Sequence, residues 1–212
     1  MMKGYPVFPL FIVVILGLSA CAKLQRSYPE RNYYILSVAD NNNPNKQAVY
    51  GATLEVDRLQ ISPSFSGREF VYRKGELSYE SDFYNQFFRA PVLLITDEVI
   101  KYLSRSGPFQ HVVDSTANLN TDFTLQGNVS ELYGDFRTRS APKAVLAIQF
   151  FLIDDRPANP VIVFQNNYRR EIALSSNSPS ILVEGWNEAL EQILAALQED
   201  LRKVSISGVS NR

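Results

Sequence analysis

The chain has 212 residues, of which 45% are hydrophobic, 12% aromatic and 20% charged, and its formal net charge at pH 7 is -1. This composition is typical of a globular domain and excludes a disordered chain. The near-neutral charge gives no support for a nucleic-acid partner, which is bound mainly by neutralising phosphates. A single cysteine, Cys21, excludes an intramolecular disulfide, so the fold must depend on its hydrophobic core.

An apolar run from Val7 to Leu18, preceded by Lys3, has the length of a signal-peptide core. It is shorter than the roughly 20 residues that a membrane-spanning helix needs. The run ends in Leu-Ser-Ala-Cys, which resembles the bacterial lipoprotein processing site, where the thiol is alkylated by diacylglycerol and the chain is cut before the cysteine. We therefore predict a lipoprotein signal peptide over residues 1–20, cleavage between Ala20 and Cys21, and a lipid anchor of acyl chains such as palmitate on Cys21.

The chemistry explains these residue types. Small side chains before the cysteine fit a narrow protease pocket, and a thiolate is a nucleophile that a hydroxyl group cannot match near neutral pH. Two or three acyl chains, at about 0.8 kcal/mol per buried methylene, hold such a protein on its membrane. The alternative is a buried or free thiol behind a plain signal peptide, which leaves a reactive group in an oxidising compartment. Ala22, rather than an aspartate, follows the cysteine, and this resembles outer-membrane sorting.

The mature chain is predicted to have a polar lipidated tether over 21–31, one domain over 32–204 and a flexible tail over 205–212. The first half of the domain predicts strands at 33–38 and 54–62 and a hairpin over 69–79 with its turn at Lys74-Gly75. In the second strand the apolar parity changes between Val56 and Leu59. That change indicates a bulge or burial on both faces.

Four aromatic rings occur within six residues just before the next predicted element. They are Phe83, Tyr84, Phe87 and Phe88. Such clusters are usually part of a core, and where they are exposed they mark a partner or lipid-facing surface. We treat these four residues as a candidate partner surface.

Pro91 suits the first position of an amphipathic helix that ends at Gly107-Pro108. Strands are predicted over 109–113, 123–133 and 144–153, and the last of these is almost continuously apolar, as in a central strand. A further strand has an inward stripe made of Ile162, Phe164, Tyr168, Ile172 and Leu174. Ser178-Pro179 begins a closing helix whose apolar stripe consists of Leu182, Trp186, Ala189, Leu190, Ile193, Leu197 and Leu201.

The residues that could carry chemistry are isolated. His111 is the only histidine, and Asp97 and Glu98 are adjacent in a helix, so they point to different parts of its surface. Asp154 and Asp155 fit a turn better than a cation site, because no third spaced ligand follows. No zinc spacing, phosphate loop, nucleophile elbow or repeat occurs. The sequence therefore predicts no enzyme, no cofactor and no metal site.

The order of elements and several phrases resemble the ABC-type transport auxiliary lipoprotein family, to which paraquat-inducible protein C belongs. The matching phrases are the lipobox ending in Cys21, Tyr33-Tyr34-Ile35-Leu36, Phe70-Val71-Tyr72-Arg73-Lys74-Gly75, Phe88-Arg89-Ala90-Pro91, Ser106-Gly107-Pro108-Phe109, and the closing helix around Trp186. They cover nearly the whole mature chain, and their order and spacing carry the resemblance.

The resemblance implies a three-layer α/β domain with a mixed β-sheet packed by two main helices, similar to anticodon-binding-like and TolB amino-terminal domains. It also implies a lipid-anchored periplasmic lipoprotein of the outer membrane, without enzymatic activity. Its implied partners are a mammalian-cell-entry (MCE)-type substrate-binding protein with its permease and ATPase, and other copies of itself in an oligomeric ring. Such a system moves lipids or other hydrophobic compounds across the envelope. Two alternatives stay open: another envelope-assembly lipoprotein, of lipopolysaccharide export or a secretion system, and a lipid-binding module.

Overall fold

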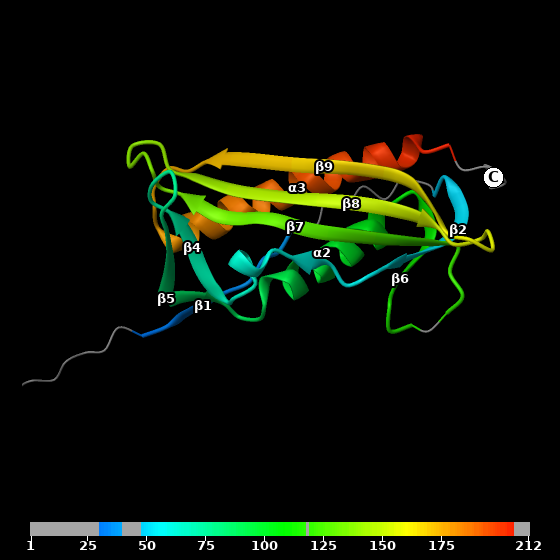
Figure 1. Ribbon diagram of the computed structural model, residues 1–212, viewed down its shortest axis with the longest axis horizontal. Coiled ribbons are helices and arrows are strands. Elements are labelled where there is room, and N and C mark those ends of the chain that lie inside the picture. The colour runs from blue at the N-terminus through cyan, green and yellow to red at the C-terminus, as the bar shows by residue number, and fades with distance from the viewer. Residues whose placement is uncertain (1–29, 40–47, 118, 206–212) are drawn as a thin grey trace, which may run out of the picture. The chain divides into compact units, whose positions relative to one another are not determined.

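The computed structural model describes residues 30–39, 48–117 and 119–205 (Figure 1). The predicted signal peptide, Cys21, nearly all of the tether and all but the first residue of the predicted tail lie outside the described residues. The described residues from Arg31 onward form one compact unit.

A long strand, β7 (Phe123–Asp135), lies at the centre of a mixed sheet. On one side it pairs in antiparallel fashion with β8 (Lys143–Asp154), and β8 pairs in the same way with β9 (Val161–Ala173). The predicted central strand is confirmed, because β8 is flanked on both sides and buried over most of its length. These three long strands form the continuous half of the sheet.

The other side of β7 pairs with three short parallel strands in succession. They are β2 (Tyr50–Val56), β3 (Gln60–Ile61) and β4 (Glu69–Arg73). The sheet then continues from two of them. β6 (Phe109–Asp114) pairs with β2, while β5 (Tyr79–Phe87) pairs with β4 and carries β1 (Asn32–Tyr34) at its outer side. The predicted hairpin is confirmed in its first strand, β4, but its turn covers residues 74–78, so Leu77 is exposed in the turn and the return strand is β5. β1 is shorter than the strand predicted over 33–38.

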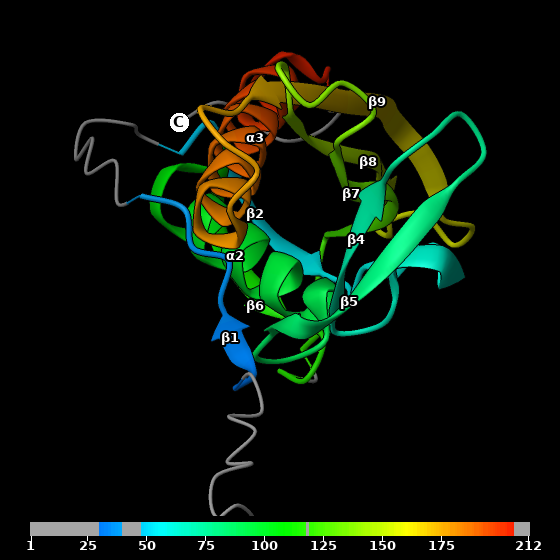
Figure 2. The same ribbon diagram turned by 90° about the vertical axis from the view of Figure 1, so that its left-hand side faces the viewer.

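Two helices, α2 (Pro91–Ser106) and α3 (Pro179–Lys203), lie on the inner side of the curled sheet (Figure 2). A short 3-10 helix, η2 (Pro63–Phe65), precedes β4. The side chains of both helices and of the sheet form one hydrophobic cluster, in which Trp186 of α3 is completely buried. The α/β fold with a mixed sheet and two main helices is thus confirmed.

Both helices begin as the sequence predicts. Pro91 is the first residue of α2, and Gly107 follows its last turn. At α3 the Ser178 hydroxyl accepts a hydrogen bond from the backbone N–H of Ile181 at 3.4 Å, which satisfies one of the free donors of the first turn.

The parity change near Leu59 has a specific cause. The chain leaves the sheet between β2 and β3, so Val56 and Leu59 are both buried although they lie three positions apart. The backbone N–H of Leu59 donates to the hydroxyl of Thr96 in α2 at 3.3 Å. The predicted single strand is therefore two strands, β2 and β3. The segment between them is held to α2 by this hydrogen bond.

The inward stripe predicted for the last strand is wrong at Ile162. The pairing of β8 with β9 shifts between Leu152 and Ile153, which leaves one extra residue, Val163, in β9. Phe164 therefore faces the core, whereas Ile162 is turned to the other face and is 57% exposed.

Candidate functional site: an aromatic edge on strands β1 and β5

β1 and β5 lie side by side at one margin of the sheet, although the paired residues Asn32 and Asn85 are 53 positions apart in the chain. Exposed apolar side chains gather on and beside these two strands. They are Tyr33, Ile35, Phe83, Tyr84 and Phe88, and their exposed fractions are 50, 58, 57, 43 and 61%. We call these five residues the aromatic edge. Clustered exposed apolar groups are typical of contact surfaces, so the aromatic edge is the candidate contact surface of the domain.

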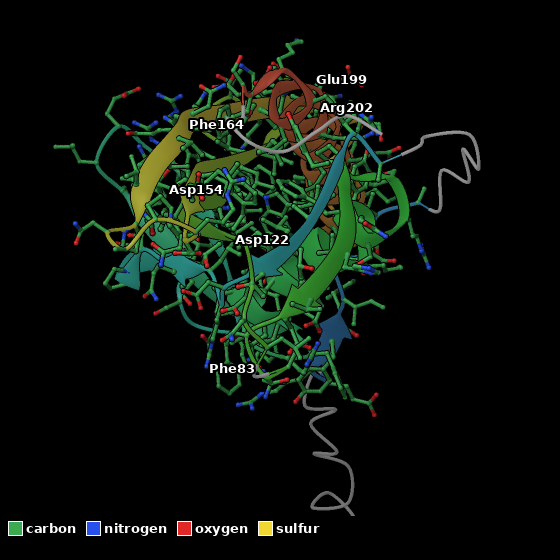
Figure 3. All side chains as sticks on the ribbon, turned by 90° about the vertical axis from the view of Figure 1, so that its right-hand side faces the viewer. Phe83, Asp122, Asp154, Phe164, Glu199 and Arg202 are labelled. Carbon is green, nitrogen blue, oxygen red and sulfur yellow. The ribbon has the colours of Figure 1, made fainter. Side chains whose placement is uncertain are left out.

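The rings of the aromatic edge pack on one another. The Tyr33 and Phe88 rings meet edge to face at 6.5 Å between centroids, and those of Phe83 and Tyr84 do so at 5.4 Å. Figure 3 shows Phe83 at the outer margin of the domain, away from the core. Three of the four residues predicted as a partner surface are therefore exposed, as such a surface requires.

The fourth, Phe87, is not part of this surface. It is 2% exposed, and its ring contacts those of Phe70 and Trp186 at 4.7 and 5.4 Å. Successive side chains of a strand point to opposite faces. Phe87, the last residue of β5, faces the core, and Phe88, which lies just beyond the end of the strand, faces outward. Tyr33 and Ile35 were missed as surface residues, although the same period required one residue of the Tyr33-Tyr34 pair to point outward.

A wide bulge in β5 presents Phe83 and Tyr84. Phe70 of β4 pairs with Asp82, but the preceding residue, Glu69, pairs with Gln86, so three residues of β5 have no partner in β4. These three residues are 83–85. Pairing with the parallel partner β1 begins at Asn85, the last residue of the bulge, and at Gln86 β5 pairs with β1 on one side and again with β4 on the other.

The carboxylate of Asp82 holds the bulge together. One oxygen, Oδ1, accepts from the backbone N–H groups of Tyr84 and Asn85 at 2.8 and 3.1 Å. The other, Oδ2, accepts from the Tyr72 hydroxyl and from Asn85 Nδ2, both at 2.7 Å. A single side chain therefore fixes the backbone that carries the exposed rings.

These hydrogen bonds also set the protonation of Asp82 and Tyr72. Burial by itself raises the pKa of Asp82, but the donors from Tyr72, Asn85 and Tyr84 together hold that pKa below its usual value. The pKa of Tyr72 is raised, first by burial and then by its bond to Asp82. At neutral pH the pair is thus an ionised carboxylate bound to a neutral phenol.

Arginine side chains stand over the rings of the aromatic edge. The guanidinium carbon of Arg31 lies 4.0 Å from the centroid of the Phe83 ring, and that of Arg68 lies 5.3 Å from the Tyr33 ring. Arg68 is also fixed by donating from Nε to the carbonyl of Phe87 at 2.9 Å. The edge therefore combines exposed rings with positive charge.

The structure does not bring the other predicted polar residues together. His111 is exposed on β6, and Asp97 forms an ion pair with Arg89. Glu98 instead accepts from the backbone N–H of Val38 at 2.8 Å, which ties the segment after β1 to α2.

Asp154 and Asp155 have turn and surface roles, as predicted: the first binds the Arg156 side chain and the second the Thr124 hydroxyl. Among the residues that the structure describes, no group of three or more acidic, histidine or cysteine side chains could hold a metal ion. In the same part of the chain, no helix is both long enough and apolar enough to cross a bilayer.

Two surface pockets lie elsewhere. One, of about 310 Å³, is lined by residues of η2, β4 and β5 that include Ser64, Glu69 and Glu80. The other, of about 170 Å³, lies between the connection after β2 and strand β7. Small-molecule sites are commonly about 300–1,000 Å³ and mostly apolar. The larger pocket is at the lower limit of that range, and its lining mixes apolar residues such as Val71 and Tyr79 with the carboxylates of Glu69 and Glu80.

No family model matches the sequence, and no curated protein matches it either. Solved structures do match. Protein XCC0632 from Xanthomonas campestris, of family DUF330, is 16% identical, with 78% of this chain and 92% of that chain covered and a TM-score of 0.67. The crystal structure of an uncharacterized protein is also 16% identical, with coverage of 81% and 99% and a TM-score of 0.63. These similarities establish the fold alone.

A more distant match is the PelC dodecamer from Paraburkholderia phytofirmans. It is 17% identical over 70% of this chain and 91% of that chain, with a TM-score of 0.41. A similarity this low supports no inference about assembly.

Proposed function

We propose that this chain is a periplasmic lipoprotein, anchored to the outer membrane through Cys21, that serves as an auxiliary component of an MCE-type ABC transport system. In this role it docks the transport assembly, which moves lipids or other hydrophobic compounds, to the outer membrane. The proposed partners are the MCE-type substrate-binding protein with its permease and ATPase, and other copies of the chain in a ring. The chain itself catalyses no reaction.

One observation carries this proposal. The domain places its exposed rings at the strand that follows the predicted tether, with Arg31, the last tether residue, packed on Phe83 at 4.0 Å. A lipid anchor confines the domain to the membrane plane, so a weak contact between the rest of the domain and the transport assembly becomes effectively intramolecular. A docking function needs this anchor and a face of the domain that the membrane leaves free.

The anchor is tested by replacing Cys21 with serine in the full chain and separating membranes from the soluble periplasm. We expect the wild-type protein in the outer-membrane fraction and the Cys21→Ser protein outside it. Mass analysis of the mature wild-type protein should give a lipid-modified amino terminus at Cys21. A Cys21→Ser protein that stays in the membrane fraction would refute the anchor.

The transport partner is tested by crosslinking in cells, followed by identification of the captured proteins. We expect an MCE-type protein to be captured by the wild-type chain and lost with the Cys21→Ser chain, which is no longer confined to the membrane. Capture of lipopolysaccharide-export or secretion components instead would favour another envelope-assembly lipoprotein. Bound lipid in the purified Cys21→Ser protein would favour a lipid-binding module.

A further inference from the structure

We infer that the aromatic edge rests on the phospholipid surface of the membrane that holds Cys21, with its rings in the headgroup layer. This inference depends on the lipid anchor proposed above and adds to it a defined orientation of the domain.

The length of the tether supports this placement. Nine residues, 22–30, separate Cys21 from Arg31, and a fully extended chain over this distance spans at most about 35 Å. Arg31 contacts the aromatic edge directly through the Phe83 ring. The edge is therefore the surface of the domain that the chain reaches first from the anchor, and it stays within reach of the bilayer however the tether is arranged.

The chemistry of the edge matches a membrane interface. Tyrosine rings carry an apolar body and a polar hydroxyl, which suits the boundary between acyl chains and water, and phenylalanine and isoleucine add apolar contact. Arginine side chains lay their stems along apolar surface while the charged group reaches phosphate. Tyr33, Tyr84 and Arg31 provide these groups on one margin of the sheet, and Arg68 adds a second positive charge over Tyr33.

A protein partner is the competing occupant, and the position and charge of the edge favour lipid. The rings lie where the predicted tether joins the domain, and the guanidinium groups of Arg31 and Arg68 lie over two of them, so phosphate groups at a bilayer surface are within reach of both. Rings that stand on an open strand margin can enter a fluid headgroup layer without a complementary cavity.

The test uses the full lipidated chain in vesicles of phosphatidylethanolamine and phosphatidylglycerol, with tryptophan placed on the edge by Phe83→Trp. The matched control is Ile162→Trp, because Ile162 has the same exposed fraction, 57%, and β9 begins at the opposite end of the sheet from β1 and β5 (Figure 1). The native Trp186 is completely buried and present in both proteins, so its emission is a common background.

Brominated phospholipid quenches tryptophan that reaches the lipid. Because interfacial side chains enter about 5–10 Å into the headgroup boundary, we expect quenching of the Phe83→Trp protein to exceed that of the control by about twofold or more. Equal quenching of both proteins while both float with the vesicles would overturn this inference and leave the anchor standing. If neither protein floats, the anchor itself is wrong. Crosslinking from position 83 to a protein, without lipid quenching, would also overturn the inference in favour of a protein partner.

The arginines give a second readout. Quenching at position 83 should rise with the phosphatidylglycerol fraction, fall with added salt, and weaken in the Arg31→Gln/Arg68→Gln protein. Arg58→Gln, an exposed arginine between β2 and β3, is the control for loss of charge and should leave quenching unchanged. An equal effect of Arg58→Gln would show nonspecific attraction and contradict the assignment of the edge.

Discussion

Replacing Asp82 with alanine is expected to loosen the bulge that carries Phe83 and Tyr84. The carboxylate accepts four hydrogen bonds, two from backbone N–H groups and two from side chains. The donor that matters most is the Tyr72 hydroxyl, because Tyr72 is only 8% exposed and water cannot readily replace the lost acceptor. The two backbone donors lie nearer the surface and can be hydrated.

The magnitude follows from these positions. A buried polar group left without a partner costs about 1–3 kcal/mol, and a hydrogen bond to a charged group contributes about 1.5–3 kcal/mol. The more exposed donors can form hydrogen bonds with water in the variant, which offsets part of the lost free energy. We therefore expect Asp82→Ala to lower the free energy of unfolding by about 2–3 kcal/mol. Asp82→Asn keeps one acceptor oxygen and should lose about 1 kcal/mol.

The fluorescence of Trp186 reports urea unfolding near the bulge. Its ring packs on the rings of Phe70 and Phe87, and Phe87 pairs with β1 next to the bulge. The matched control is Glu80→Ala, which removes an exposed carboxylate from the same strand and should change stability by less than about 0.5 kcal/mol. An Asp82→Ala protein as stable as the Glu80→Ala protein would refute the role of this carboxylate.

The same bonds predict a dependence on pH. The pKa of Asp82 is lower in the folded protein than the value of about 3.9 expected when it is unfolded. Its contribution is therefore fully present above the unfolded pKa and is lost as the pH falls through the folded pKa. We expect the stability difference between wild type and Asp82→Asn to be constant from pH 7 to about 5 and to shrink below pH 4. A difference that grows on acidification would contradict this sign.

Three further substitutions test the packing in urea unfolding. Gly185→Ala places a Cβ 2.8 Å from the Cβ of Ala144, so it should cost about 1–3 kcal/mol despite the better helix propensity of alanine; an unchanged midpoint would contradict this contact. Thr96→Val leaves the buried N–H of Leu59 without an acceptor and should cost about 1–3 kcal/mol, while Thr96→Ser should retain most of the stability. Tyr50→Phe removes the hydroxyl that binds the last carbonyls of α3 and should cost about 1 kcal/mol, with faster amide exchange confined to that helix end.

The helices and long strands could be predicted because their patterns are local. The stripe of α3, the proline at the start of α2 and the apolar run of β8 are each visible within a few residues of sequence. The predictions fail where a contact with a distant strand or helix determines the conformation of the segment. The extra residue at Val163 depends on the register of β8, and the break before Leu59 depends on a hydroxyl in α2. The residues around Val163 do not reveal the first, while the parity change between Val56 and Leu59 indicates an irregularity but not a complete break of the strand.

The candidate site divides in the same way. The density of rings from Phe83 to Phe88 was visible in the sequence, but which ring faces outward was not. Phe87, the last residue of β5, faces the core, whereas Phe88 lies just beyond the end of the strand and faces outward. Phe83 lies two and four positions before Asn85 and Phe87, so alternation alone would place it on their inner face. The bulge, whose backbone is held by Asp82, removes Phe83 from that face, and it depends on the register between β4 and β5.

The exposed rings are not required by the core, and this gives them functional meaning. Residues 83–85 have no partner in β4, and Phe83, Tyr84 and Phe88 retain roughly half of their surface in water, so polar residues at these positions would cost the fold little. Instead, the hydrogen bond from the nearly buried Tyr72 hydroxyl to the ionised Asp82 carboxylate stabilises the backbone that exposes them. Loss of either partner would leave the other without a hydrogen bond and lower the stability of the fold. A domain that fixes its exposed rings so firmly, beside the strand that follows its predicted lipid tether, has a surface suited to a defined contact rather than to solvent.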